Sequence, residues 1–158
     1  MVGPTRVRYD APGWGVGELW LEGGAVVASA LPRPGVRHTA TARPRAPYGP
    51  LVERLRAFFA GHEVSFEDVA VVDPPGFHGR CARALRQVGR GEVVTYGELA
   101  ALAGRPLAAR AAGTFCARCE LSPFVPTHRV VSAGGIGGYG DLGTDYKRRL
   151  LELEHVRL

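Results

Sequence analysis

The chain has 158 residues and a mass of 16.9 kDa, enough for one or two small domains with a buried core. Its apolar runs are far shorter than the roughly 20 residues of a membrane helix, so we expect no membrane partner. No basic segment followed by an apolar stretch opens the sequence, and the three cysteines are an odd number. Both features argue against secretion and favour a cytoplasmic location.

The net charge of +5 lies in one part of the chain. Residues 1–76 carry eight arginines and eight acidic residues, and residues 131–158 are also balanced. Residues 77–130 carry eight arginines against three glutamates. Such a basic block is typical of a surface that contacts phosphates, although an arginine-rich chain can also present it as an ordinary solvated face. Composition alone therefore leaves nucleic-acid binding open.

The first half has the pattern of a small α/β domain. Apolar residues on both sides of a Glu-Gly-Gly turn predict a β-hairpin over residues 15–31. Five prolines predict a long loop over 32–50, and apolar residues at helical spacing predict a helix over 51–60. Residues 69–72 are compatible with a strand. The breaker Asp-Pro-Pro-Gly follows, so we place a domain boundary after residue 76.

The second half is predicted to be helical. Apolar positions at helical spacing predict a helix over 77–88, with Cys81 in the core. Thr95 and Glu98 have capping-box spacing and predict a helix over 96–103. Pro106 then favours a second helix over 107–116, and a last helix is expected over 144–154. Two short helices joined by a glycine-containing turn suggest a helix-turn-helix.

Five segments of the second half carry distinctive motifs. They are GEVVTYGELA at 91–100, AARAAG at 108–113, PTHRVV at 126–131, GGYG at 137–140 and LLxxE at 150–154. Together they resemble the O6-alkylguanine-DNA alkyltransferase family, the methylated-DNA–protein-cysteine methyltransferases. The resemblance implies an α/β (α+β) fold, with a small ribonuclease-H-like domain over 1–76 and a helical DNA-binding domain with a helix-turn-helix over 77–158.

The resemblance also implies roles in DNA binding. Tyr96 matches the tyrosine that helps rotate the target nucleotide out of the duplex, and Arg110 matches the residue that fills the vacated place. The helix around Arg110 matches the recognition helix that enters the minor groove, through its small residues Ala109, Ala111 and Gly113. Extruding a base costs a few kcal/mol and therefore requires both a plug and a pocket.

The same resemblance implies a reaction centre. His128 and Glu154 match the two residues that activate the nucleophile through a water. The alkylguanine pocket is expected to include Tyr139, Val130 and Gly138. We expect no metal and no cofactor.

The sequence departs from the family pattern at two positions. The family's reactive cysteine lies in Pro-Cys-His-Arg, and here that position is Thr127. A hydroxyl is far less acidic than a thiol, so alkyl transfer to Thr127 is not expected. The family's asparagine, eight residues earlier, is replaced by Cys119. This second change suggests a reshaped pocket.

We therefore expect a protein that binds O6-alkylguanine in duplex DNA without alkyl transfer, as a monomer with a possible repair-protein partner. An alternative is a single-turnover transferase with a relocated acceptor, Cys119 or Cys116, activated by the neighbouring Arg118. Further alternatives are hydrolysis by a water that His128 activates, an engineered Thr127, and a purely structural protein. In a purely structural protein, His128 would simply pair with Glu154. Independently of these alternatives, we expect Arg129 to form a structural ion pair. The Cys116–Cys119 spacing is a weak signal for zinc or thiol redox chemistry.

Overall fold

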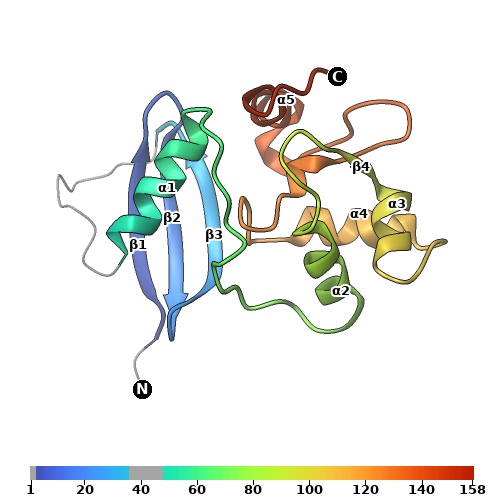
Figure 1. The fold of residues 1–158 in the computed structure, drawn as a ribbon, viewed down its shortest axis with the longest axis horizontal. Coiled ribbons are helices and arrows are strands. Elements are labelled where there is room, and N and C mark those ends of the chain that lie inside the picture. Colours follow the sequence, from blue (N-terminus) through green and yellow to red (C-terminus); the bar gives the residue numbers. More distant parts are fainter. Residues whose placement is uncertain (1–2, 36–47) are drawn as a thin grey trace. The chain divides into compact units, whose positions relative to one another are not determined.

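The computed structural model describes residues 3–35 and 48–158. The chain divides into two compact units, Met1–Val72 and Asp73–Leu158. Figure 1 shows a sheet accompanied by a helix in the first unit and mainly helices in the second. The architecture therefore mixes helices and sheets, as predicted. In the described residues, no helix has both the length and the apolar character needed to span a membrane.

The first unit is built on an antiparallel sheet of three strands in the order β1-β2-β3. These are β1 (Thr5–Ala11), β2 (Gly15–Glu22) and β3 (Ala25–Arg33). The predicted hairpin is β2–β3, with Glu22 opposite Ala25 across the turn. The sequence prediction missed β1, although its buried residues alternate with outward-facing ones as in a half-buried strand: Val7, Tyr9 and Ala11.

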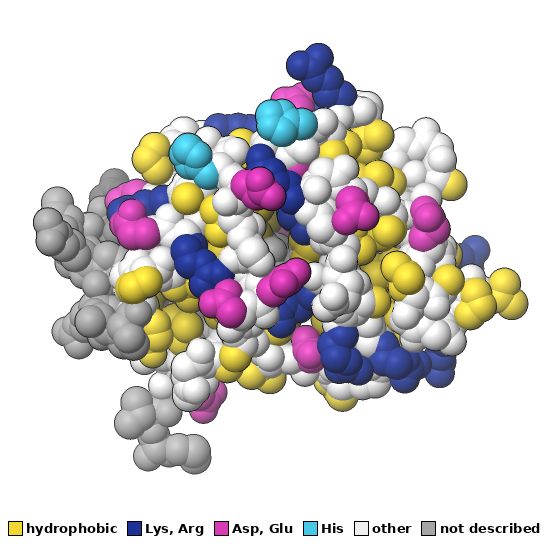
Figure 2. All heavy atoms as spheres, viewed as in Figure 1, with side chains coloured by type: hydrophobic (Ala, Val, Ile, Leu, Met, Phe, Trp, Pro, Cys, Tyr) yellow, Lys and Arg dark blue, Asp and Glu magenta, His cyan; other side chains and the backbone are white. Residues whose placement is uncertain are grey.

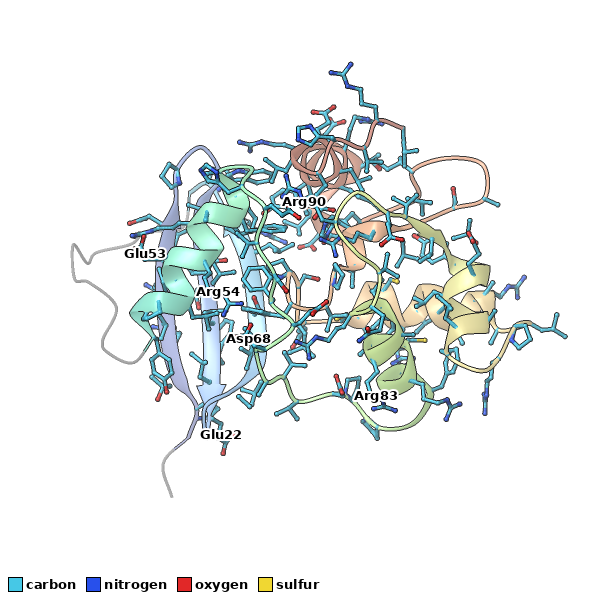
Figure 3. The ribbon with its side chains drawn as sticks, viewed as in Figure 1. Glu22, Glu53, Arg54, Asp68, Arg83 and Arg90 are labelled. Atoms are coloured by element: carbon cyan, nitrogen blue, oxygen red, sulfur yellow. The ribbon has the colours of Figure 1, made fainter. Side chains whose placement is uncertain are left out.

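One helix, α1 (Gly49–Phe59), lies against β1 and completes the core of this unit. It begins two residues earlier than predicted because Pro50 fits the first turn, where an N–H has no helical partner. The indole of Trp14 donates a hydrogen bond of 2.9 Å to the Phe59 carbonyl. On its exposed side, Arg54 forms an ion pair of 2.6 Å with Asp68 (Figure 3).

Two predictions for this unit need correction. The loop expected over 32–50 is shorter, because its first residues belong to β3 and its last to α1; residues 36–47 lie outside the described residues. The segment 69–72 forms no strand. It makes a single parallel bridge between Val71 and Val26 of β3.

The second unit contains α2 (Gly76–Leu85), α3 (Tyr96–Leu102), α4 (Ala109–Arg118) and α5 (Thr144–Leu153). Their inward faces bury Cys81, Leu85, Leu99, Ala112, Phe115, Leu150 and Leu151.

The predicted boundaries in this unit hold within a few residues. The capping box at the start of α3 is present, because the Thr95 hydroxyl accepts from the Glu98 N–H and the Glu98 carboxylate accepts from the Thr95 N–H. The second helix of the pair begins two residues later than predicted, because the chain turns at Leu107, which is fully exposed.

Two very short strands, β4 (Val94–Thr95) and β5 (Val130–Val131), pair in parallel. Val94 lies opposite Val130 and Thr95 opposite Val131. This pairing joins the start of α3 to the chain that follows the 3-10 turn Thr127–Arg129. Segments more than 30 positions apart in the sequence thus meet at one place.

Candidate functional site

Thr127 lies in a cluster of hydroxyl groups. Its Oγ1 is 2.7 Å from Ser122 Oγ and 3.1 Å from Tyr139 Oη. The side chains of Thr127 and Ser122 are buried, and Tyr139 is half-buried. Within the described residues, the hydrogen bonds of the Thr127 hydroxyl are therefore to other hydroxyls and not to a histidine nitrogen. Among the described residues, no histidine nitrogen or carboxylate is therefore in direct hydrogen-bond contact with this hydroxyl.

Glu154 follows the last residue of α5, and its side chain is completely buried. Its Oε1 is 3.0 Å from His128 Nε2 and accepts from Arg129 Nε at 2.9 Å. Its Oε2 accepts from Arg129 Nη2 at 2.5 Å. Arg129 also donates to the Val88 carbonyl at 2.7 Å, so one guanidinium ties α5 to the turn after α2. The ion pair predicted for Arg129 is present.

The charges in this network are set by burial and by hydrogen bonds. Burial alone would raise the pKa of Glu154, but the hydrogen bonds from Arg129 and His128 outweigh it and lower the pKa to about 2. Burial lowers the pKa of His128, so its ring is neutral at pH 7. Because the ionised carboxylate only accepts, His128 Nε2 carries the proton and Nδ1 has the lone pair.

Lys147 is the only lysine in the chain, and α5 carries it into the interior. Its Nζ donates to the Val130 carbonyl at 2.6 Å and to the Gly138 carbonyl at 3.1 Å. It also lies 5.8 Å from the ring centroid of Tyr96 and 5.9 Å from that of Tyr139. One ammonium group therefore joins the strand after Thr127 to the glycine loop, between two aromatic rings.

The pKa of Lys147 leads to a testable pH dependence. Burial lowers this pKa from 10.5 to about 8. Because the unfolded chain then binds more protons than the folded one between pH 8 and 10.5, this group adds stability as the pH rises. We expect the stability difference between the protein and its Lys147→Met variant to change by about 3 kcal/mol across this interval. Urea unfolding at a series of pH values measures the difference; parallel curves would contradict the assigned shift.

Tyr96 is the first residue of α3 and reaches the same region. A Cβ added at Gly137 would lie 2.9 Å from Tyr96 Oη, 3.2 Å from the Ser132 backbone nitrogen and 3.4 Å from Lys147 Nζ. Gly137 also has φ of +76°, which disfavours other residues. Gly113 of α4 also lies near the Tyr96 ring, but a Cβ added there would make an ordinary van der Waals contact of 3.9 Å with Cδ1 of that ring. Gly137 in the loop therefore leaves room for the Tyr96 hydroxyl.

The basic side chains of this unit lie mostly on its surface. Arg110 is exposed near the start of α4, and Ala109 beside it is exposed as well. Arg80 and Arg105 both lie over the ring of Phe77, at 5.6 and 5.5 Å from its centroid. Figure 2 shows basic side chains gathered on part of the face of this unit, and Figure 3 labels Arg83 of α2. α2 and the helix pair thus share a cationic surface.

The two thiols offered as relocated acceptors are not activated. Burial raises the pKa of Cys119 to about 11 and that of Cys116 to about 12. The expectation that Arg118 lowers the pKa of Cys119 is therefore wrong, because burial dominates. At pH 7 the Cys119 thiol is therefore protonated. In the described residues, no three histidine, cysteine or acidic side chains gather where a metal ion could be held.

The structure brings five of the predicted site residues into one region, through the contacts described above: Thr127, His128, Glu154, Tyr96 and Tyr139. Val130 is completely buried and presents its carbonyl to Lys147, whereas Gly138 is exposed. Ser122 and Lys147 were not identified from the sequence. The single lysine in an arginine-rich chain was a usable signal for Lys147, but nothing marked Ser122.

Comparison with known proteins gives consistent matches. The family model described as "6-O-methylguanine DNA methyltransferase, DNA binding domain" matches residues 76–156. A methylated-DNA–protein-cysteine methyltransferase of Mycolicibacterium paratuberculosis is 41% identical over 115 residues, which are 72% of this chain and 68% of that protein. One from Metallosphaera sedula is 36% identical over 105 residues, 66% of this chain and 65% of that protein. The matches thus span about two thirds of these relatives' length.

Two solved structures are similar over nearly the whole chain. Mycobacterium tuberculosis OGT in complex with DNA aligns with a TM-score of 0.78 and 32% identity, covering 95% of this chain and 92% of that one. The O6-methylguanine-DNA methyltransferase of the hyperthermophilic archaeon Pyrococcus kodakaraensis aligns with a TM-score of 0.61 and 25% identity. That alignment covers 99% of this chain and 100% of the other. Both units are therefore included in the similarity.

Proposed function

The chain belongs to the 6-O-methylguanine DNA methyltransferase family, and we propose that it binds O6-alkylguanine in double-stranded DNA without taking over the alkyl group. DNA as the partner is supported by the similar Mycobacterium tuberculosis protein, whose structure is a complex with DNA. It is also supported by the exposed arginines on α2 and α4. Cations at these positions neutralise phosphates and give sequence-independent affinity.

The absence of transfer rests on one observation, the hydroxyl at position 127. It stands where the family has its cysteine, and a hydroxyl is far harder to ionise than a thiol. Its direct hydrogen bonds are to the hydroxyls of Ser122 and Tyr139. The thiols of Cys116 and Cys119 do not substitute for it, since burial raises the pKa of both. Recognition without reaction is the function that this arrangement supports best.

In this proposal, α4 enters the minor groove with its small residues Ala109, Ala111 and Gly113. Arg110, exposed beside them, fills the place of the extruded nucleotide, while Tyr96 assists its rotation. The extruded base meets Tyr139 and the loop at Gly138. The protein acts as a monomer in the cytoplasm and hands the marked site to another repair protein.

The test is a fluorescence-anisotropy titration with two duplexes that differ only in a single O6-methylguanine. We expect tighter binding to the damaged duplex, and an affinity for both that falls as salt rises. We expect Arg110→Ala to weaken binding to the damaged duplex about tenfold. Arg6→Ala, which removes an exposed arginine from β1, serves as the matched control and should change little. Equal affinities for the two duplexes would refute damage recognition.

A further inference from the structure

The connection between α3 and α4 presents leucine side chains to solvent. Leu107 is 100% exposed, and Leu102, the last residue of α3, is 61% exposed. They are two of the four large hydrophobic side chains that are exposed in the described residues. Because the side chain of Leu107 is fully exposed, it adds nothing to the packing of the described part of the chain. The fold therefore does not account for a leucine at this position.

The backbone that carries Leu107 is ordered by a turn. The chain leaves α3 through Gly104, whose φ of +91° suits the end of a helix. The Ala108 N–H then donates to the Arg105 carbonyl at 3.0 Å and closes a turn of four residues. Pro106 and Leu107 are the two central residues of this turn, and the proline ring fixes its own φ. Such an ordered backbone lowers the entropy cost of a contact made by the leucine side chain.

The chain around this leucine is cationic. Residues 99–119 contain three arginines and no acidic residue. The Arg105 guanidinium is held 5.5 Å from the centroid of the Phe77 ring, and Arg110 is exposed. Figure 2 shows hydrophobic side chains next to basic ones on the surface of this unit. An apolar side chain with cations on both sides of it in the chain complements a partner that is anionic but also offers apolar surface.

Duplex DNA offers both features, because the deoxyribose rings along its minor groove are the least polar part of the backbone and phosphates lie beside them. We propose that Leu107 packs against deoxyribose rings at the edge of the minor groove while α4 lies in that groove. Leu107 precedes Arg110 by three residues, so this contact lies roughly one to two base steps from the extruded nucleotide. The inference rests on the proposed function, because it uses the same placement of α4. A sugar contact reads neither the base nor the lesion, so it adds affinity for any duplex.

The experiment is an anisotropy titration of Leu107→Ala with the undamaged and the O6-methylguanine duplex at several salt concentrations. We expect about fivefold weaker binding to both duplexes, because apolar area that DNA would cover is lost. The dependence of affinity on salt should not change, because no charge is removed, whereas Arg105→Ala should make it shallower. Leu107→Met should keep most of the affinity, and Leu107→Gln, of similar size but polar, should lose as much as the alanine variant. Leu158→Ala, at an exposed leucine outside the α3–α4 pair, is the matched control and should bind normally.

The outcomes separate this contact from damage recognition. Unchanged affinity of Leu107→Ala for both duplexes would overturn the contact, and a preference of the unaltered protein for the damaged duplex would still support the proposed function. Weaker binding by Leu107→Ala, without such a preference in the unaltered protein, would support the contact and refute damage recognition. Full affinity of Leu107→Gln would also overturn the contact, since an apolar side chain would then not be needed. Urea unfolding should be the same for all Leu107 variants, because this side chain is fully exposed.

Discussion

Replacing Thr127 by cysteine is expected to convert the protein into a single-turnover alkyl acceptor. The variant would place a thiol, which is far more acidic than a hydroxyl, next in the chain to a neutral His128 that is held by Glu154. The thiolate would attack the methyl carbon, form a sulfur–carbon bond and displace guanine through its O6. Intact-protein mass spectrometry after incubation with an O6-methylguanine duplex should show one added methyl group per variant molecule and none on the unchanged protein.

Two further variants show whether methyl transfer to the Thr127→Cys variant uses the existing site. Thr127→Ser keeps a hydroxyl and should remain unmodified, because a hydroxyl is much harder to ionise than a thiol. His128→Ala added to Thr127→Cys should slow the modification strongly, since the ring that can relay the proton is gone. If Thr127→Cys bound the damaged duplex and stayed unmodified, residue 127 would not face the alkyl group as we propose.

The second large effect concerns the stability that Glu154 provides. Glu154→Ala should lower the free energy of unfolding by about 3–5 kcal/mol, because it leaves the Arg129 guanidinium in a buried place without its carboxylate. It also removes the partner of His128 Nε2. Urea unfolding measures the loss. Glu152→Ala, at an exposed neighbour on α5, is the matched control and should change the free energy of unfolding little.

The same carboxylate should make the protein sensitive to acid. Its pKa falls from 4.5 to about 2 on folding, so it binds fewer protons in the folded state. The stability that it contributes is fully present above about pH 4.5 and is lost as the pH falls toward 2. The shift corresponds to about 3 kcal/mol. Glu154→Gln should lack this part of the acid sensitivity, and identical acid profiles for the two proteins would contradict the assigned shift.

Local sequence signals predicted the local structure well. The spacing of Thr95 and Glu98 predicted the start of α3, and a Glu-Gly-Gly turn predicted the β2–β3 hairpin. Strand β1 was missed, although its alternation of buried and exposed residues is a local signal. The pair β4–β5 could not be predicted, because strands of two residues exist only through their pairing with each other.

For the site as well, local motifs were informative, whereas contacts that depend on the fold were not predicted. The motifs placed His128 and Glu154 in one functional group, and the structure joins them at 3.0 Å. Ser122 was missed because its closeness to Thr127 depends on the fold of the loop between them. The error at Cys119 has a related cause: sequence adjacency to an arginine suggested a lowered pKa, whereas burial, which sequence spacing does not report, raises it.

Native mass spectrometry tests recognition without transfer most directly. The protein would be mixed with equal amounts of an undamaged duplex and a duplex of different mass that carries one O6-methylguanine. Our account predicts that the complex with the damaged duplex dominates, and that protein and DNA each keep their original mass when that complex is dissociated. A protein heavier by one methyl group, or equal amounts of the two complexes, would contradict it.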